Sequence, residues 1–296
     1  MAATFRHAVR YWVEAQCITP LRTGGTDGDV EAVLTDSDGR PFVQGTSLAG
    51  AMRHWMAENG EATLVESLFG SQSQGGGLMV SDAQFAPETE RSIRPRLRIN
   101  GATGSAAQGG KFDVAQINAG AKFSFQLTWL GMEAESGEIT AVERMLSALN
   151  AGIICLGGQK SNGFGRVSLS VRKHVYDMTR EQDREAWLEE NACGQPLNLP
   201  EVKNANRVIF TLTGRADSLL VKAAAAKRRD GRTITGNLEE SGRPVLPGSS
   251  VKGAVRARAE LIARSTGRPE ELVEELFGRE ARGRGQGRPG QVRFED

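Results

Sequence analysis

The chain of 296 residues contains few of the residues on which several common protein classes depend. It has three histidines and three cysteines, and Cys17, Cys155 and Cys193 are scattered along the sequence. This pattern excludes a disulfide framework and a CxxC zinc pair, and it fits a reduced cytoplasm. No run of about 18 apolar residues is present, and the first residues lack the apolar region of a signal peptide. We therefore expect a cytoplasmic protein without a membrane segment.

The net charge is also small, +1 at pH 7, but it is unevenly distributed. Residues 201–296 contain 19 Lys and Arg against 13 Asp and Glu, a net charge of +6, whereas residues 1–200 carry −5. A basic half often binds a large anion, and nucleic acid is the commonest one. A solvated basic surface without a ligand is the alternative interpretation.

Two stretches of the chain repeat each other. The string GTSLAGAMR at 45–53 returns as GSSVKGAVR at 248–256, with glycine, serine, glycine and arginine at the same spacing. Leu-Phe-Gly follows both strings, at 68–70 and at 276–278. An internal duplication of this kind indicates two units built on one plan.

Hydrophobic periodicity predicts the secondary structure of the first unit. Alternating apolar residues predict strands over 9–17, 78–85, 123–129 and 167–171, and helical spacing predicts helices over 45–59 and 139–153. The order strand, helix, strand, strand, helix, strand is that of the ferredoxin-like βαββαβ plan, of the α+β class. The basic stretch 91–112 interrupts this order and predicts a long hairpin that projects from the sheet.

The same cycle begins again after a connector that includes a charged helix near 180–190. A strand is predicted at 208–212 and a helix from Gly248, and 292–296 corresponds to 78–82. This second copy is incomplete, because a third strand, a second helix and a fourth strand do not follow. Half a unit buries its sheet poorly, so we expect the rest to come from more chain, another chain or an assembly. The predicted domains are 1–172 and 207–296, joined by a linker at 173–206.

The two glycine turns lead into basic helices. A hydroxyl at a helix start can cap the first amides, and those amides together with the helix dipole can hold a phosphate. An ordinary helix cap beside solvated basic residues is the alternative. The candidate phosphate-binding residues are Gly45, Thr46, Ser47, Arg53, Gly248, Ser249, Ser250, Lys252 and Arg256.

A glycine-rich string, GGQKSNGFGR, occupies 157–166 between the second helix and the fourth strand. Its glycines permit positive φ and close approach of the backbone to a ligand, and its two cations suit a phosphodiester chain. A tight turn with Phe164 in the core is the alternative. The candidate RNA-binding residues are Gly158, Lys160, Ser161, Gly163 and Arg166.

These motifs, in this order, resemble the RAMP superfamily of CRISPR-associated proteins. The strings GTSLAGAMR, LFGS and LGGQKSNGFGRV carry the resemblance, together with IRPRLRIN at 93–100 and GKF at 110–112. The similarity is closest to the backbone (seventh Cas family) subunits of type III effectors and covers nearly all of 8–172 and, in part, 207–296. The tandem arrangement is similar to fused backbone subunits and to single-polypeptide type III-E effectors.

The resemblance implies an RRM-like ferredoxin sheet whose hairpin acts as a thumb. Such subunits stack along a CRISPR guide RNA and leave its bases free to pair with a complementary target RNA. The hairpin residues Arg94, Arg96, Arg98 and Lys111 suit contact with RNA electrostatically. The implied partners are guide RNA, target RNA and other RAMP domains or subunits that complete the second unit.

The resemblance also implies a target-cleaving aspartate in the loop before the first glycine turn. Asp29 fits this place best by its spacing to Asp36, Asp27 is next, and Asp230 corresponds in the second copy, where Asn237 replaces the second acid. An ionised carboxylate at Asp29 could hold Mg²⁺ or Mn²⁺ beside a phosphate, or help activate a ribose hydroxyl. The alternative is that these aspartates simply favour turns.

Two further functions stay open at this point. The chain could be a non-catalytic scaffold for guide RNA. It could also be an endoribonuclease that processes guide precursors with His54 or His174 and no metal. The duplication argues against processing, because such an enzyme needs one active site rather than a row.

Overall fold

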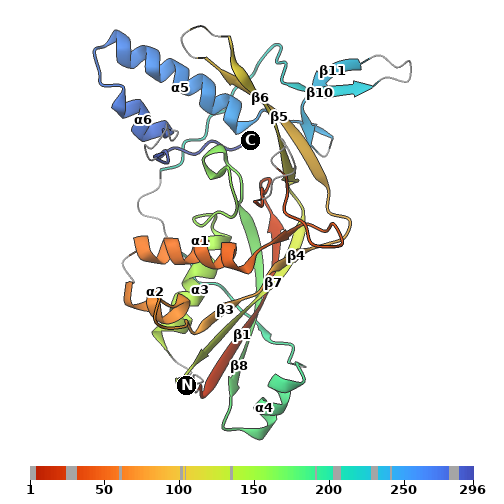
Figure 1. Cartoon of the computed structure of the whole chain (residues 1–296), viewed down its shortest axis with the longest axis vertical. Coiled ribbons are helices and arrows are strands. Elements are labelled where there is room, and N and C mark those ends of the chain that lie inside the picture. Colours follow the sequence, from red (N-terminus) through yellow and green to blue (C-terminus); the bar gives the residue numbers. More distant parts are fainter. Residues whose placement is uncertain are drawn as a thin grey trace.

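The structure is a computed structural model. It describes residues 5–24, 32–59, 62–100, 103, 105–133, 136–190, 192–202, 208–227, 233–240, 242–279 and 287–296. It shows a mixed α+β protein with antiparallel sheets (Figure 1). Every helix within these ranges is too short or too polar to cross a lipid bilayer.

The main sheet has seven strands in the order β2–β4–β7–β1–β8–β9, and β3 also pairs with β7. Its long strands are β1 (His7–Cys17), β7 (Lys122–Gly131) and β8 (Val167–Asp177). β1 lies between β7 and β8 and is antiparallel to both. The short strands are β2 (Phe42–Val43), β3 (Leu78–Val80), β4 (Ala83–Phe85) and β9 (Gln195–Pro196).

Three helices pack on one face of this sheet, namely α1 (Gly45–Glu58), α2 (Ala62–Phe69) and α3 (Gly137–Asn150). Alternate residues of β1, including Tyr11 and Val13, are buried, as are Leu48, Met52 and Met56 of α1. This burial follows the predicted strand and helix periodicities. On the other face, α4 (Glu181–Leu188) covers Arg10, whose guanidinium carbon lies 4.4 Å from the Trp187 ring centroid.

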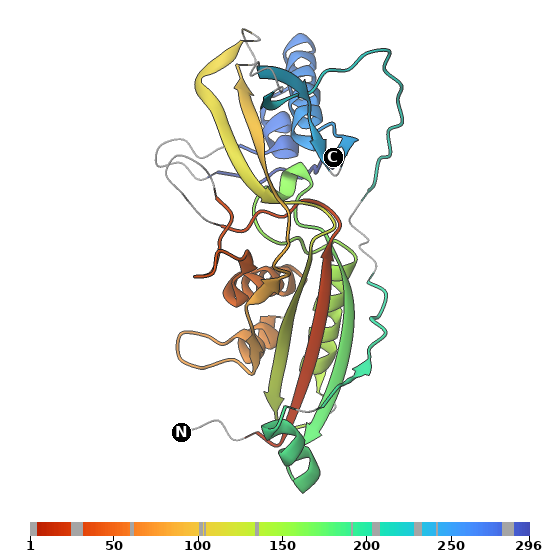
Figure 2. The same cartoon turned by 90° about the vertical axis from the view of Figure 1, so that its right-hand side faces the viewer.

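The predicted hairpin is confirmed as β5 (Arg91–Ile99) paired with β6 (Ala106–Ile117). It rises from the end of the long strands and lies beside the helix α5 (Gly248–Ser265) (Figure 2). Its base is fixed by two backbone hydrogen bonds between Leu21 and Ile117, of 3.0 and 2.8 Å. Because the base is anchored in this way, the hairpin stands as an extension of the sheet.

Two element boundaries differ from the sequence prediction. The strand predicted over 78–85 is broken at Ser81 and Asp82, because the Asp82 side chain turns toward the start of α1. The fourth strand, β8, continues to Asp177, so the first residues of the predicted connector belong to the sheet. The charged helix in the connector is confirmed as α4.

After β9, the described residues form two helices and two small hairpins. The helices are α5 (Gly248–Ser265) and α6 (Glu271–Phe277). The hairpins pair β10 (Lys222–Lys227) with β11 (Thr233–Asn237) and β12 (Glu239–Glu240) with β13 (Arg243–Pro244). Hydrophobic periodicity did not predict these two hairpins.

The strand predicted at 208–212 is wrong. The structure describes all of residues 208–221, and none of them lies in a strand; Phe210 is 82% exposed. In the first unit the equivalent strand, β1, is paired on both sides. An apolar alternation therefore does not form a strand here, because no long strand of the described second unit pairs with it.

The duplication is visible in three dimensions. We call residues 45–82 the first repeat and residues 248–296 the second repeat. The Gly45 N–H donates to the Asp82 side chain at 2.7 Å, and the Gly248 N–H donates to the Asp296 side chain at 2.8 Å. The Gly70 and Gly278 N–H groups bond to Glu66 and Glu274 carbonyls at 2.8 and 2.9 Å. The two repeats therefore share backbone geometry as well as sequence.

The two repeats differ in what covers their helices. Met52 of α1 is 0% exposed, whereas the equivalent Val255 of α5 is 41% exposed. Leu68 is 0% exposed, and the equivalent Leu276 is 43% exposed. The large core belongs to the first unit, and the second repeat has a small cluster around Val273 and Phe277.

Replacing Gly45 by alanine is expected to destabilise the protein by about 1–3 kcal/mol, because the added Cβ would lie 2.3 Å from the Val80 carbonyl oxygen. Gly50→Ala in the same helix is the matched control. Nothing lies within 4 Å of its added Cβ, so we expect a gain of about 0.5–1 kcal/mol. Denaturant unfolding measures both. Equal stability of the two variants would contradict the close approach of the glycine turn to β3.

Candidate nucleic-acid interface

The glycine-rich loop packs tightly on the chain itself. A Cβ at Gly157 would meet the Arg22 carbonyl oxygen at 2.0 Å, and one at Gly165 would meet the Leu156 carbonyl oxygen at 2.0 Å. Both glycines have positive φ, which side-chain-bearing residues rarely adopt. Phe164 between them is fully buried. The prediction that these glycines admit a ligand is therefore wrong for Gly157 and Gly165, whose close neighbours are protein atoms.

Gly163 and Ser161 of this loop contact the end of the second repeat. A Cβ at Gly163 would lie 2.5 Å from the Phe294 carbonyl oxygen, and the Phe294 N–H donates to the Ser161 carbonyl oxygen at 3.3 Å. Arg166 Nη1 pairs with Glu295 Oε2 at 2.6 Å. Arg293 Nη2 in turn donates to the Gly152 carbonyl oxygen at 3.0 Å. The end of the second repeat therefore packs directly against the glycine-rich loop.

Arg94 lies at the centre of this contact and is only 2% exposed. Its guanidinium bridges the carboxylates of Glu240 and Asp296, with 2.8 Å to Asp296 Oδ2. Gln116 Nε2 donates to the same Glu240 oxygen at 2.6 Å. Burial alone would lower the pKa of Arg94, but the hydrogen bonds and charges of Asp296 and Glu240 outweigh it and raise this pKa.

We call the contacts among Arg94, Gly163, Arg166, Glu240, Glu295 and Asp296 the joint. Its charged groups are paired within the chain, so three predictions need correction. Arg94 does not face RNA from the hairpin, because two carboxylates enclose it. Gly163 and Arg166 face the second repeat instead of a phosphate.

The helix starts also differ from the prediction. α1 begins at Gly45 and α5 at Gly248, so the capping positions are Gln44 and Pro247. The hydroxyls of Thr46, Ser47, Ser249 and Ser250 lie inside the first turn, two or three residues too late to cap it. The first amide of each helix is instead bonded to an aspartate, Asp82 or Asp296. A carboxylate already satisfies the helix dipole there and repels a phosphate. The repeated helix start is therefore a poor anion site.

The basic residues of the helices have different surroundings. Arg256 Nε pairs with Glu260 at 2.9 Å and its Nη1 donates to the Gly278 carbonyl oxygen at 3.0 Å, so it ties α5 to the end of α6. Lys252 is half-buried, and burial and then the Arg256 charge lower its pKa. Arg53, at the equivalent position of α1, is exposed. Arg256 and Lys252 of the second repeat are therefore engaged in contacts within the protein, contrary to the prediction that they bind a phosphate.

A second group of predicted residues remains on the surface. Arg98 and Lys111 are exposed on the two strands of the hairpin, and Lys160 is exposed on the short 3-10 helix η1 (Lys160–Asn162). Arg96 Nη1 donates to Gln159 Oε1 at 3.0 Å and holds the hairpin against the loop that carries Lys160. Exposed cations on joined rigid elements suit contact with a phosphate chain. Because Lys111 pairs with Leu97, its side chain lies on the face of the hairpin opposite Arg96 and the loop. We call Arg98, Lys111 and Lys160, which flank the hairpin on both faces, the basic ridge.

Comparison with known proteins supplies the family. The sequence model of the RAMP superfamily matches residues 14–168 and 232–296, well over half of the chain. The chain belongs to the RAMP superfamily. The match includes all of both repeats and the whole glycine-rich loop at 157–166. No curated protein sequence matches the chain.

The fold was also compared with solved structures, of which many are similar to this chain. One similar chain comes from the cryo-EM structure of the type III-B Cmr-β bound to cognate target RNA. It is 15% identical with a TM-score of 0.46, and the match covers 58% of this chain and 61% of that chain. The present chain thus spans less than two thirds of that relative, and a similarity this distant identifies no shared activity.

The aspartates predicted to cleave RNA, Asp27, Asp29 and Asp230, lie outside the described residues. The nearest described residues show how the first of these loops is bounded: the Leu34 N–H donates to Thr23 Oγ1 at 2.9 Å. Asp36 Oδ1 accepts from the amides of Asp38 and Arg40, as a turn residue does. Within the described ranges, no three His, Cys, Asp or Glu side chains are grouped to hold a metal.

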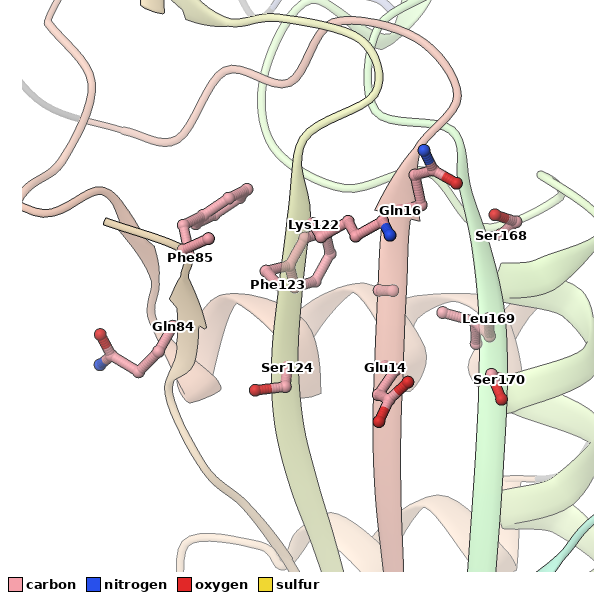
Figure 3. A pocket seen from close by; sticks show the side chains of 12 residues that line it. Glu14, Gln16, Gln84, Phe85, Lys122, Phe123, Ser124, Ser168, Leu169 and Ser170 are labelled. Atoms are coloured by element: carbon pink, nitrogen blue, oxygen red, sulfur yellow. The ribbon is translucent and has the colours of Figure 1, made fainter. Parts of the chain in front are cut away.

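The exposed face of the RAMP sheet carries a shallow pocket of about 610 Å³ (Figure 3). Glu14, Ser124 and Ser170 form a row across three adjacent strands there. Lys122 is the only positively charged residue that lines this pocket, Glu14 is the only negatively charged one, and the other lining residues are neutral. This pocket lacks the charge of the basic ridge and was not predicted from sequence.

Sequence reasoning missed the acidic half of the RAMP joint. Glu240 and Asp296 were not predicted as functional, although both contact Arg94. The duplication held a signal for Asp296, because it aligns with Asp82 at the end of each repeat. No comparable signal marked Glu240, Gln116 or Gln159.

Proposed function

We propose that this chain is a guide-RNA-binding backbone of a type III CRISPR effector, in which it positions complementary target RNA. The observation that carries the proposal is the RAMP match, which includes both repeats. On this proposal each repeat belongs to one RNA-binding unit. The proposed domains are 1–172, to which the end of β8 adds residues up to Asp177, and, as the N-terminal part of a second unit, 207–296. The rest of 173–206 is the proposed linker. Further RAMP domains or subunits would complete the second sheet.

The strand order supports a ferredoxin-like assignment for the first domain. Strands β3 and β4, then β7, β1 and β8 lie in the order expected of a βαββαβ unit, with α1 and α3 on one face. The proposed RNA path runs over the hairpin and η1, which carry the basic ridge. Contacts there would go to the sugar–phosphate chain, so base pairing rather than protein side chains would supply sequence specificity.

We also propose target cleavage by the loop aspartates, with Asp29 as the residue that would hold Mg²⁺ or Mn²⁺. A carboxylate and the phosphate oxygens of RNA form the oxygen donor set that these ions favour. The metal would supply Lewis-acid stabilisation of the reacting phosphate. Asp27 and Asp230 are the other candidates.

Asp29→Ala is expected to remove one cut site in bound target RNA and to leave guide binding unchanged, because the basic ridge is intact. Gel analysis of end-labelled target RNA with Mg²⁺ measures this, and Asp36→Ala, in the neighbouring turn, is the control. Persistence of every cut in both Asp29→Ala and Asp27→Ala would refute the catalytic assignment. Absence of any metal-dependent product would favour the scaffold, and cleavage in EDTA would favour guide processing.

The described histidines give no specific support to guide processing. His54 Nε2 lies 3.3 Å from Glu58 Oε1 on the exposed side of α1. The His174 ring packs edge-on against the Tyr176 ring, with 4.4 Å between the ring centroids. Neither residue lies on the hairpin or η1, which carry the basic ridge. Metal-dependent target cleavage therefore remains the preferred activity.

A further inference from the structure

One end of the open sheet face is covered by the segment that follows β8. We call residues 178–190 and 192–199, which include α4 and β9, the strap. Its helix α4 lies at the opposite end of the long strands from the hairpin (Figures 1 and 2). A Cβ added to Gly194 would meet the Trp12 ring at 2.7 Å, so the strap lies directly on this face. From Glu14 onwards the same face is the open pocket of Figure 3.

The covered half of the face combines aromatic and cationic side chains on two adjacent strands. They are Arg10 and Trp12 of β1 and Arg172, His174 and Tyr176 of β8. In the strand register Arg10 lies opposite His174, and Trp12 lies opposite Arg172. Because side chains alternate along a strand, all five belong to one face of the sheet. We call these five residues the platform.

The composition of the platform suits single-stranded nucleic acid. Bases stack on aromatic rings whatever their sequence, and neighbouring cations neutralise the phosphates. The platform has two arginines and no carboxylate. Glu14 is the next residue of β1 on this face and lines the open pocket, so the platform ends at Trp12.

The strap occupies the platform with groups that resemble those of a nucleotide. The guanidinium carbon of Arg10 lies 4.4 Å from the Trp187 ring centroid, so the indole stacks there as a base would. Glu190 Oε1 lies 3.6 Å from Arg10 Nη2, in the manner of a phosphate oxygen. Five acids and two arginines give residues 178–190 a net charge of −3. The strap and an RNA strand would therefore compete for the same groups.

The α4 end of the strap is weakly held. No residue of α4 is buried, and Glu190 has a φ of 53°, which residues with a side chain rarely adopt. Beneath it, the buried Arg10 Nε and Tyr176 hydroxyl have no hydrogen-bond partner among the described residues. Sparse packing and unsatisfied polar atoms both lower the cost of lifting α4. Leu197 and Leu199 pack against the core, so the other end of the strap stays anchored.

We propose that the platform is a second binding surface for single-stranded RNA, which the strap covers and from which RNA displaces α4. This surface is separate from the basic ridge, which lies on the hairpin and η1. The inference goes beyond the proposed function and rests on it only for the choice of RNA over DNA. Because the strap and RNA exclude each other, a change that weakens the strap should strengthen RNA binding.

The test uses the full chain with the three cations of the basic ridge replaced by glutamine, so that its outcome does not depend on binding there. Trp187→Ala/Glu190→Gln is added to this background, because it removes the two groups of the strap that engage Arg10. We expect the affinity for a fluorescent single-stranded RNA of about 10 nucleotides to rise about 10-fold. Fluorescence anisotropy measures this gain. Binding at the basic ridge is measured separately, so each proposal can fail alone.

Two further measurements locate the gain. Hydrogen exchange at the Asp177 amide, which donates to Asp183 Oδ2 at 2.9 Å, reports whether α4 has lifted. Crosslinking of thiouridine-containing RNA should mark peptides from β1 and β8. Adding Arg172→Gln/His174→Gln should abolish the gain, because both side chains belong to the platform. Lys122→Gln, on the open half of the same face, should leave the gain intact.

A lifted α4 without a gain in affinity overturns the proposal, because the uncovered platform would then not bind RNA. A gain that survives the loss of Arg172 and His174, or crosslinks that lie elsewhere, would show that another surface binds the RNA. Retained protection of the Asp177 amide also overturns the proposal, because α4 would then not lift when its contacts to Arg10 are removed. Binding of a peptide with the sequence of 178–190, in place of RNA, would assign the platform to acidic protein segments.

Discussion

Replacing Arg98, Lys111 and Lys160 together by glutamine is expected to weaken binding of single-stranded RNA by about 50-fold at 0.15 M salt. Each cation of the basic ridge that neutralises a phosphate releases counterions, which adds about 0.7 to the steepness of the log–log salt dependence. Loss of three such contacts should therefore flatten the slope by about 2. Fluorescence anisotropy of a labelled RNA over a salt series measures the affinity and the slope together.

The control for this prediction is Lys122→Gln. Lys122 is exposed on the open face of the sheet, in the pocket of Figure 3, and belongs to neither the hairpin nor η1. Its loss should leave the salt slope unchanged. An equal change of slope in the control and the triple variant would mean that binding is a diffuse property of the surface. An unchanged slope in the triple variant would place the RNA elsewhere.

Replacing Arg94 by methionine is expected to destabilise the joint by about 3–5 kcal/mol. The substitution preserves much of the apolar stem but leaves the carboxylates of Glu240 and Asp296 without their shared cation. Two negative charges would then face each other in a site that water reaches poorly. Native-state hydrogen exchange at the Phe294 amide, which bonds to Ser161, reports opening of this contact directly.

Two further variants separate the lost charge pair from general damage to the hairpin. Lys111→Met changes an exposed cation on the same hairpin and should leave the protection of Phe294 unchanged. Arg94→Met/Glu240→Gln/Asp296→Asn removes the uncompensated charges and should recover most of the lost protection. Failure of this triple variant to recover would show that packing, and not charge, holds the joint.

The parts of the fold that sequence predicted are those decided by local pattern. The alternation in β1 and the stripe of Leu48, Met52 and Met56 in α1 each mark a buried face, and both elements formed as expected. The duplication predicted that 292–296 corresponds to 78–82. The bonds from Gly45 to Asp82 and from Gly248 to Asp296 confirm this correspondence.

The parts that sequence did not predict depend on distant partners. The alternation at 208–212 looks like β1, but a strand forms only where neighbours pair with it, and pattern alone does not supply them. Arg94 and Arg98 are two cations four residues apart on one strand, yet the first is enclosed by carboxylates from over a hundred residues away and the second is exposed. Composition gives both the same charge, and only tertiary contact separates their roles.

The glycine-rich loop shows the same limit. Its composition correctly predicted that other atoms approach the glycine backbone closely. It did not predict that these atoms belong to the protein itself. The neighbours are Arg22, Leu156 and Phe294, so the glycines organise the protein around the basic ridge. The signal for function therefore lies in Lys160 and in the hairpin, rather than in the glycines themselves.

The central claim is that the chain binds the sugar–phosphate backbone of RNA through the cations of the basic ridge. It is tested most directly by measuring the affinity of the purified full chain for unrelated single-stranded RNAs over a salt series. We predict binding to all of them with a log–log salt slope of about −2 or steeper, set by the cations of the basic ridge. No detectable binding, or an affinity that salt leaves unchanged, would contradict the claim.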